Sequence, residues 1–466
     1  MDRMHDMGAP KIRPRLPDLR SASLALIYGV LPNLPFWIAT HLFNVERPYI
    51  VLDYLVSGVV FAYGWRKLGA VLTTVFLLAD ALSIQGLVYP VLHPSDIFYL
   101  VTLLPYAPPI WQLTTFGGLV MLTAMVGTAY HFARNTDRLA ALLLLGLAVL
   151  GYGAQSRLDP RSSEFDRNKS SVLGSQLAYY TNTRANLVLD SVFERVNPLH
   201  SVGFRDEIAA WTRDRTASRK LLLIVVESWG QMKDQRLQDA MLKPLLAEQA
   251  RFQWVEKGRA PGDHATVEAE LRYLCGLAAR HLNLAPVTGG FEHCLPWQLK
   301  ARGYRTTAIH AADGGMHARQ FWYPRAGFDT ILFRDTASWR TRCHSFPGAC
   351  DREIMESTLP ASFEGDDRQF VYWMTLNTHA PYDQRDLWLD AFDCAGYQLP
   401  EHGDTCRMSK LHAQFFHQLA DVLVQPAMRG AEVFIVGDHS PPILDQQEFK
   451  RHFVDGAVPY VHLRVK

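Results

Sequence analysis

Long apolar stretches with few charged residues fill the first third of the chain. They run over Ser21–Val45, Tyr49–Trp65, Leu68–Leu92, Trp111–Phe132 and Leu139–Gln155. From position 21 to 133 only seven residues are Asp, Glu, Lys or Arg, and from 139 to 156 there are none. Because about 20 apolar residues cross the hydrocarbon core of a bilayer as a helix, the pattern predicts a five-span transmembrane anchor over residues 1–156.

Basic residues alternate between the two sides of this predicted anchor. The N-terminal tail and the second and fourth loops contain Arg3, Lys11, Arg13, Arg15, Arg20, Arg66, Lys67, Arg134 and Arg138. The first and third loops contain Glu46, Arg47, His93 and Asp96. Since basic loops are retained in the cytoplasm, we expect a cytoplasmic N-terminus and a position outside the cytoplasm for everything after Gln155.

Two carboxylates and one proline-rich segment depart from the simple apolar pattern. Asp53 and Asp80 fall within predicted spans, where an ionised side chain is costly. Sequence alone leaves two interpretations open. In the first, the two carboxylates face lipid headgroups or a polar cavity; in the second, they only cap loops near the interface. The segment Asp96–Ile110 contains three prolines, and we interpret it as a short interfacial or re-entrant segment on the outer face.

The average composition hides this division of the chain. The 466 residues contain 47 Lys and Arg against 46 Asp and Glu, with a mean hydropathy of -0.05. That balance excludes a basic nucleic-acid-binding protein and an acidic disordered chain. The chain therefore combines an almost uncharged membrane part with a polar second part.

The second part has the pattern of an α/β domain. Residues 157–215 form a polar juxtamembrane linker, in which Leu173 to Val196 looks helical and is expected to lie along the surface. Beyond it, strand-like runs occur at Leu221–Val226, Thr306–Ile309, Gln369–Leu376 and Val433–Val436, and helical patterns at Thr266–Arg280 and Ser409–Val424. This alternation predicts an α/β domain with a mostly parallel central sheet over residues 216–466.

All six cysteines lie beyond the last predicted span. They are Cys275, Cys294, Cys343, Cys350, Cys394 and Cys406. An even number in an exported region indicates disulfides, and the absence of a CxxC pair argues against a zinc-thiolate site. Six cysteines allow fifteen pairings. The shortest loops favour Cys275–Cys294, Cys343–Cys350 and Cys394–Cys406.

Chemically active side chains follow the predicted strands. Glu227, His310 and His379 follow the first three, and Asp438 and His439 follow the fourth. Because ligands bind beyond the carboxyl ends of strands in open α/β sheets, we expect these side chains at one edge. Carboxylate oxygens and imidazole nitrogens suit a divalent ion such as Zn²⁺ or Mn²⁺.

Thr266 is the candidate nucleophile. It stands at the start of a predicted helix, where free backbone N–H groups and the helix dipole favour an anion. A hydroxyl beside a divalent ion is a competent nucleophile toward phosphorus. The alternative is that Thr266 is only the N-cap of the helix, with Glu270 in its first turn.

These motifs resemble the membrane-anchored phosphotransferase branch of the alkaline phosphatase and sulfatase superfamily, which includes phosphoethanolamine transferases and lipoteichoic acid synthases. The resemblance covers the chain from about Leu221 onward. It rests on the segments Ile224–Ser228, Thr266–Glu270, Asn377–Tyr382 and Gly437–His439, and on the His310 segment through Arg319 to Asp329. The sulfatase motif, in which Pro and Arg follow a Cys or Ser, is absent, so sulfate-ester hydrolysis is disfavoured.

The resemblance implies a role for each candidate residue. Glu227, Thr266, Asp438 and His439 would hold a divalent metal ion, zinc rather than manganese, and Thr266 would be the catalytic nucleophile. Substrate-binding roles would fall to His310, His317, Arg319, His379 and His452. The sequence departs from the family at His317, where lipoteichoic acid synthases usually have tryptophan, and it lacks the cysteine-rich flank of lipid A modifiers.

The resemblance also implies an activity. A phospho-headgroup, phosphoethanolamine or phosphoglycerol, would pass from a membrane phospholipid to a cell-envelope glycan or glycolipid through a phospho-threonine intermediate. The enzyme would be a multi-pass protein of the bacterial inner membrane with a periplasmic catalytic domain. The alternatives are a metal-dependent phosphodiesterase or sulfatase-like hydrolase, and a catalytically dead membrane-anchored glycan-binding protein. The sequence leaves the headgroup, the acceptor and the oligomeric state open.

Overall fold

The chain forms two compact units. The structure, a computed structural model, describes residues 30–43, 45, 47–88, 101–132, 137–158, 172–181, 198–213, 218–263, 265–280, 282–365 and 367–466. One unit comprises Met1–His41, Glu46–Ile84 and Gly117–Arg184, and the other comprises Leu42–Val45, Gln85–Phe116 and Ala185–Lys466. The basic N-terminal tail, residues 21–29 and 44 of the first predicted span, and the third predicted loop lie outside the described residues.

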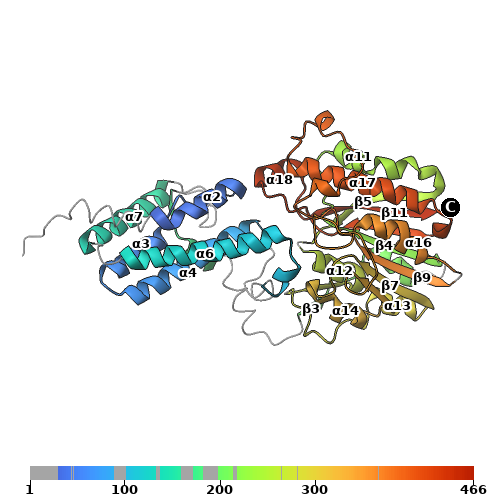
Figure 1. The fold of residues 1–466 in the computed structure, drawn as a ribbon, viewed down its shortest axis with the longest axis horizontal. Coiled ribbons are helices and arrows are strands. Elements are labelled where there is room, and N and C mark those ends of the chain that lie inside the picture. Colours follow the sequence, from blue (N-terminus) through green and yellow to red (C-terminus); the bar gives the residue numbers. More distant parts are fainter. Residues whose placement is uncertain are drawn as a thin grey trace, which may run out of the picture. The chain divides into compact units, whose positions relative to one another are not determined.

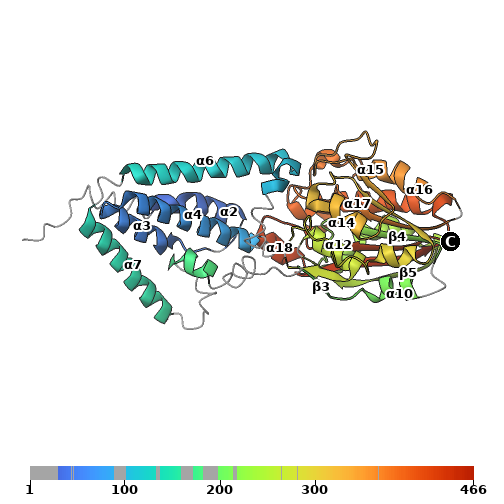
Figure 2. The same ribbon diagram turned by 90° about the horizontal axis from the view of Figure 1, so that it is seen from below.

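The N-terminal part of the chain is helical, as predicted. Its α-helices are α2 (Leu34–Phe43), α3 (Leu52–Ala62), α4 (Arg66–Val88), α6 (Pro109–Phe132) and α7 (Arg138–Leu158). Among the described residues, three helices are long and apolar enough to cross a membrane, namely α4, α6 and α7 (Figure 2). Helix α3 has 11 residues and is only about 16 Å long, because the chain turns at Gly64 with φ of +87°. The count of five spans therefore stays a prediction.

Buried polar contacts show what Asp53 and Asp80 do. Asp80 is fully buried and accepts hydrogen bonds from Arg47 Nε at 2.8 Å and from Tyr54 Oη at 2.8 Å. Asp53 accepts from Ser175 Oγ at 2.7 Å and from the backbone N–H of Leu177 at 3.0 Å. Both carboxylates are thus paired inside the first unit.

The segment after the last long helix differs from the predicted surface helix. Strand β2 (Leu173–Gly174) pairs in parallel with β1 (Ile50–Val51), and residues 176–181 are helical. The carboxylate of Asp53 provides the reason, because it caps the start of this helical turn. The prediction of a continuous helix from Leu173 is therefore wrong at its start, and its continuation past residue 181 lies outside the described residues.

A seven-stranded sheet forms the centre of the second unit, in the order β5-β11-β10-β4-β9-β7-β8. The strands are β4 (Lys220–Val226), β5 (Phe252–Pro261), β7 (Tyr304–His310), β8 (Thr330–Phe333), β9 (Arg368–Met374), β10 (Glu432–Gly437) and β11 (Ala457–Val465). β10, β4, β9, β7 and β8 are parallel, and β11 runs antiparallel to both β10 and β5. The predicted α/β class with a mostly parallel sheet is confirmed.

Helices cover both faces of this sheet (Figure 1). Alternate residues of β4 separate two cores. Leu222, Ile224 and Val226 lie in the core that includes α11 (Gln235–Ala247) and α17 (Asp404–Leu423). The intervening residues lie in the core of α10 (Asp206–Arg213), α12 (Thr266–Cys275), α13 (Leu295–Lys300) and α14 (Arg319–Arg325). Each fully buried aliphatic side chain stabilises the fold by roughly 1.5–3 kcal/mol, so β4 is fixed in place.

Smaller elements complete the domain. They are β3 (Leu199–Ser201), β6 (Leu277–Ala279), α15 (Asp351–Glu353), α16 (Leu359–Ala361) and α18 (Gln446–His452). The predicted helix Thr266–Arg280 ends early, because Gly276 adopts a left-handed conformation with φ of +63° and the chain continues as β6. The sulfur atoms pair as Cys275–Cys294, Cys343–Cys350 and Cys394–Cys406, which are the three short-loop pairs.

Candidate active site

Glu227, Asp438 and His439 meet where two neighbouring parallel strands end. β4 ends one residue before Glu227, and β10 ends one residue before Asp438, with Val226 opposite Gly437 in the register. Ser228, which follows Glu227, has a left-handed φ of 59° and donates its backbone N–H to Asp438 Oδ1 at 2.8 Å. This turn ties the two strand ends together, so the carboxylates share one small volume.

Thr266 faces this cluster from the start of α12. The N-cap of the helix is Ala265, so Thr266 is the first helical residue and its hydroxyl is free for another role. Oγ1 lies 3.3 Å from Glu227 Oε2 and 3.3 Å from His439 Nε2. The alternative interpretation of Thr266 as the N-cap is therefore wrong.

Acceptor atoms predominate in this cluster. Nδ1 of His439 lies 2.8 Å from the carbonyl oxygen of Ser440, and a carbonyl only accepts, so Nδ1 carries a proton and Nε2 faces the cluster. That Nε2 lies 3.2 Å from Asp438 Oδ2 and 3.5 Å from Glu227 Oε1. Among the described residues, Asp438 Oδ2 is buried without a hydrogen-bond partner. Two carboxylates beside an imidazole suit a bound cation.

The spacing and the charge of the cluster fit a divalent metal ion. Metal–ligand bonds of about 2.0 Å in a tetrahedron place ligand atoms about 3.3 Å apart, close to the 3.2–3.5 Å measured here. Burial and the neighbouring charge of Glu227 raise the pKa of Asp438 well above its usual range, and a cation relieves both. The donor groups of Glu227, Asp438 and His439 all lie within 4.8 Å of one another.

A second cluster of metal-type side chains, Cys394, Glu401 and Cys406, is not a comparable site. Its donor atoms also lie within 4.8 Å of one another, but the two sulfur atoms form a disulfide. A disulfide sulfur has no thiolate charge to offer a metal, so the candidate metal centre is the cluster at the strand ends.

Hydrogen bonds hold the backbone around Glu227. Its N–H donates to Thr375 Oγ1 at 3.0 Å, and its carbonyl accepts from Thr378 Oγ1 at 2.6 Å. Both threonines follow β9, the strand beside β4. The third neighbouring strand thus fixes the orientation of the first candidate ligand.

Three histidines come together at the same edge. His310 ends β7 and lies with Nδ1 3.2 Å from the carbonyl oxygen of Met374. Burial and the charge of Arg319 lower the pKa values of His310 and His317 well below their usual range, and His379 adds to both effects. His439 acts on His317 in the same way. His310 and His317 are therefore largely neutral imidazoles, and their electrostatic interactions with His379, and of His317 with His439, show that these side chains gather at one edge of the sheet.

Arg319 occupies a different position from the one expected of a phosphate ligand. It is buried, and its guanidinium forms an ion pair with Glu270, with Nη2 2.8 Å from Oε2. The hydroxyls of Tyr323 and Tyr372 donate to the same carboxylate. Glu270 lies one turn after Thr266 on α12, and Arg319 lies two residues after His317. The pair thus joins the helix of Thr266 to the segment of His317.

His452 is the predicted site residue that the structure does not join to the others. It ends α18, and the charged groups that influence its imidazole are its helix neighbours Glu448 and Arg451. Its carbonyl accepts from the N–H of Lys233. A substrate-binding role for His452 stays a prediction without support from a described contact.

Two further residues at the site were not singled out from the sequence. Asp263 donates its N–H to the carbonyl of Asp438 and pairs through its carboxylate with Arg272 at 2.5 Å. Burial raises the pKa of Asp263 to about 7. His412, on α17, is fully buried next to the backbone of Glu227. His412 has no sequence signal, since it lies inside a regular helix. Asp263 does have one, because it lies only three residues before the predicted nucleophile.

Fold and site place the protein in a class, namely α/β proteins with a cluster of carboxylate, imidazole and hydroxyl groups at the carboxyl ends of parallel strands. The sulfatase family model matches residues 219–456, about half of the chain. The chain belongs to the sulfatase family, within the alkaline phosphatase superfamily, and the predicted resemblance is confirmed. Members of this superfamily depend on metal ions.

Comparison with solved structures finds distant similarity. An alkaline phosphatase superfamily protein from Vibrio parahaemolyticus is 16% identical over 53% of this chain and 60% of its own, with a TM-score of 0.41. The phosphoglycerol transferase GacH of Streptococcus pyogenes is 14% identical over 55% and 71%, with a TM-score of 0.41. The integral membrane lipooligosaccharide phosphoethanolamine transferase A of Neisseria meningitidis is 15% identical over 96% and 89%, with a TM-score of 0.47. Curated proteins give no significant sequence match.

Proposed function

We propose that the protein transfers a phospho-headgroup, phosphoethanolamine or phosphoglycerol, from a membrane phospholipid to a cell-envelope glycan or glycolipid. The observation that carries the proposal is the position of the Thr266 hydroxyl, free of helix capping and 3.3 Å from both Glu227 and His439. The apolar helices of the N-terminal part support a lipid donor, because they would hold the site next to a substrate that stays in the bilayer.

Glu227, Thr266, Asp438 and His439 would hold the metal ion; their near-tetrahedral spacing and the imidazole donor favour zinc over manganese. When bound, the ion supplies Lewis-acid stabilisation of phosphoryl charge and lowers the pKa of the threonine hydroxyl. Ser228 would position Asp438 for this task through the bond at 2.8 Å, and Thr378 would position Glu227 through the bond at 2.6 Å.

In the first half-reaction, Oγ1 of Thr266 attacks phosphorus. The Oγ1–P bond forms, and the bond between phosphorus and the diacylglycerol oxygen breaks. The threonine loses one proton, for which Oε2 of Glu227 is the nearby acceptor, and the diacylglycerol oxygen gains one. His379, which is half-buried beside His310 and His317, is the proposed proton donor to that oxygen.

In the second half-reaction, an acceptor hydroxyl attacks the same phosphorus. The new O–P bond replaces the Oγ1–P bond, the acceptor proton returns to His379, and Thr266 regains its own proton. The neutral imidazole of His317 donates a hydrogen bond to the phosphoryl group without adding a fixed positive charge. His310 uses its N–H on the carbonyl of Met374 and lines the phosphoryl site with the rest of its ring. Arg319 positions His317 through Glu270.

The enzyme is proposed to act as a multi-pass protein of the bacterial inner membrane. Residues 1–156 would form the membrane anchor, residues 157–215 the linker, and residues 216–466 the periplasmic catalytic domain. Three disulfides in the catalytic domain fit an oxidising compartment.

The test is a product assay with the full-length protein in detergent micelles. The donors are phosphatidylethanolamine and phosphatidylglycerol labelled in the headgroup, each with and without an envelope glycan fraction. We expect one equivalent of diacylglycerol without acceptor and continued turnover with it. Thr266→Ala should lower the rate at least about 1,000-fold. Equal turnover without acceptor would assign a hydrolase instead, and transfer by Thr266→Ala would contradict the proposal.

A further inference from the structure

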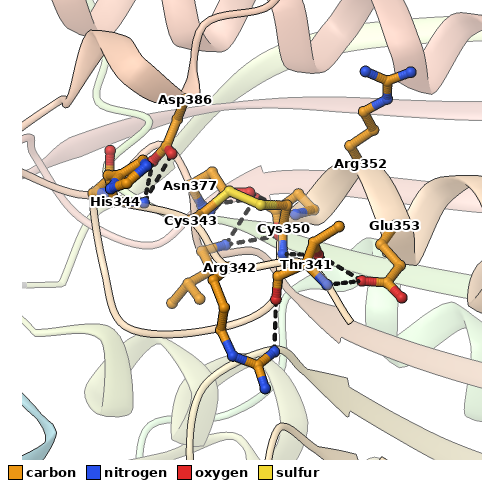
Figure 3. The surroundings of a disulfide bond; sticks show 12 residues. Thr341, Arg342, Cys343, His344, Cys350, Arg352, Glu353, Asn377 and Asp386 are labelled. Atoms are coloured by element: carbon orange, nitrogen blue, oxygen red, sulfur yellow. Dashed lines mark hydrogen bonds between the residues drawn. A yellow bond between two sulfur atoms is a disulfide. The ribbon is translucent and has the colours of Figure 1, made fainter. Parts of the chain in front are cut away.

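A cavity of about 520 Å³ lies next to the Cys343–Cys350 disulfide. Figure 3 shows the surroundings of this disulfide. Its volume is in the range of small-molecule sites, about 300–1,000 Å³. Asp351, Asn377, Thr378 and Trp388 are among the described residues that line it, and the four candidate metal ligands are not. It is therefore a separate cavity from the site of Thr266.

The cavity shares a wall with that site. Thr378 lines the cavity, and its hydroxyl donates to the carbonyl oxygen of Glu227 at 2.6 Å. Asp351 accepts the backbone N–H of Leu376 at 3.0 Å and of Asn377 at 2.7 Å, which fixes the segment between β9 and His379. A ligand in the cavity would thus lie one hydrogen-bonded segment away from the candidate catalytic residues.

One polar group of this wall lacks a partner. Oδ1 of Asn377 accepts the N–H of Asp351 at 2.5 Å, which orients the amide. Among the described residues, Nδ2 of the same amide is buried without a hydrogen-bond partner. A buried unpaired donor costs about 1–3 kcal/mol, so this amide is stabilised by any acceptor oxygen that reaches it through a small movement of the wall.

The charged groups around the cavity already have partners. Glu353 accepts from the N–H groups of Arg340 and Thr341, and Asp386 accepts from the N–H groups of His344 and Ser345 (Figure 3). Of the three lining arginines, Arg352 pairs with Glu356 at 2.6 Å and Arg385 with Asp383 at 2.5 Å. The third, Arg342, donates to the backbone carbonyl oxygens of Trp339 and Thr341. Recognition of a phosphate or carboxylate relies on unpaired arginines, so this pairing favours an uncharged ligand.

An exposed indole provides an apolar surface in this polar setting. Trp388 is 45% exposed, lines the cavity, and has the guanidinium carbon of Arg352 at 4.7 Å from its ring centroid. Its backbone N–H donates to Gln414 Oε1 at 2.7 Å, so the ring is held at its base. An aromatic ring beside hydrogen-bonding groups fits a ligand that has both C–H faces and hydroxyls.

We propose that this cavity binds neutral sugar residues of the acceptor glycan and so holds the acceptor beside the site of Thr266; this inference rests on the proposed function. The hydroxyls supply the acceptor oxygen that Asn377 Nδ2 lacks, and a sugar ring packs against Trp388. Uncharged sugars do not require an arginine as a charge partner, so the existing pairs of Arg352 and Arg385 can stay intact when the sugar binds.

The experiment measures binding and the donor half-reaction in parallel. Full-length protein is purified in lauryldimethylamine oxide, a detergent without a sugar headgroup. It is titrated calorimetrically with maltotetraose, cellotetraose, mannotetraose and chitotetraose as neutral probes, and with inorganic phosphate and glycerol 3-phosphate as anionic probes. The variants are Trp388→Ala and, as a matched control, Trp297→Ala. Trp297 is 41% exposed on α13, away from the cavity lining.

We expect at least one neutral tetrasaccharide to bind, with a Kd raised at least tenfold by Trp388→Ala and changed less than twofold by Trp297→Ala. The headgroup adduct on Thr266 should form in Trp388→Ala within twofold of the wild-type amount. The inference is overturned if no neutral probe binds, if Trp388→Ala binds as tightly as wild type, or if only the anionic probes bind and do so in a Trp388-dependent way. Absence of the adduct in the wild type would refute the proposed function, while the calorimetry would still decide whether the cavity binds sugars.

Discussion

Oγ1 of Thr266 lies 3.3 Å from Nε2 of His439, although 173 positions separate the two residues in the chain. The ring donates its Nδ1–H to the carbonyl oxygen of Ser440, which leaves Nε2 directed at the cluster. A threonine hydroxyl that faces an imidazole nitrogen and two carboxylates is an arrangement that suits a cation.

Removal of the metal should abolish activity and lower the melting temperature. Asp438→Asn should reduce the bound metal to below about one tenth of the wild-type amount, because an uncharged amide replaces a buried carboxylate ligand. Elemental analysis of the purified protein measures this. Asp421→Asn changes an exposed carboxylate of the same domain and should keep the metal. Wild-type metal content in Asp438→Asn would contradict the ligand assignment.

The buried ion pair between Glu270 and Arg319 should matter more than an exposed one. Glu270→Gln leaves the Arg319 guanidinium buried without a compensating charge, and should lower the free energy of unfolding by about 3 kcal/mol or more. Glu356→Gln breaks an exposed pair with Arg352 and should cost less than about 1 kcal/mol. Denaturant unfolding of both variants gives the comparison. Equal losses would show that burial of the first pair has no energetic weight.

Acid should destabilise the domain partly through His412. Burial lowers the pKa of His412 to about 4, below the value of about 6.5 in an unfolded chain. The unfolded state therefore takes up a proton that the folded state does not. The resulting stability is full above pH 6.5 and is lost as the pH falls from about 6.5 to about 4.

The variant His412→Gln isolates this contribution. In that pH range the slope of unfolding free energy against pH should be lower than in wild type by up to about 1.4 kcal/mol per pH unit, the value for one proton. His417→Gln, which changes a more exposed histidine of the same helix, serves as the control. An unchanged slope in His412→Gln would disprove the role of His412 in acid sensitivity.

In the N-terminal unit, Asp80→Asn should lower the melting temperature of the full-length protein in micelles. The change leaves Arg47 buried without its charge partner, and such a loss costs about 3–5 kcal/mol. The double variant Arg47→Met with Asp80→Leu should recover most of the loss, because it removes both charges. A double variant as unstable as Asp80→Asn alone would refute this explanation.

The sequence predicted those parts of the fold that follow from local patterns. The unbroken aliphatic run Leu221–Val226 marks a central parallel strand, since it is buried on both faces, and β4 covers Lys220–Val226. Strand β5 was missed, because its residues Phe252–Pro261 mix buried and exposed positions without an apolar run. Together with β11, this strand forms the antiparallel edge of the sheet. The edge could not be predicted, because neither strand has the sequence pattern of a buried parallel strand.

The candidate site was predictable to the extent that its residues follow strands. Glu227, Asp438 and His439 could be grouped because parallel strands end at one edge. The partner of Arg319 could not be identified, because an Arg that follows a histidine suits a phosphate ligand as well as a buried ion pair. Only the tertiary contact with Glu270 decides between them. The cavity beside Trp388 likewise depends on segments from several parts of the chain.

The most direct measurement of the central claim is the mass of the peptide that contains Thr266 after incubation with phospholipid donor and no acceptor. Peptides of the wild type and of Thr266→Ala are compared by mass spectrometry after rapid denaturation. The account predicts one added phospho-headgroup, phosphoethanolamine or phosphoglycerol, located on Thr266 and absent from the variant. Headgroup transfer that proceeds without any adduct on Thr266 would contradict it.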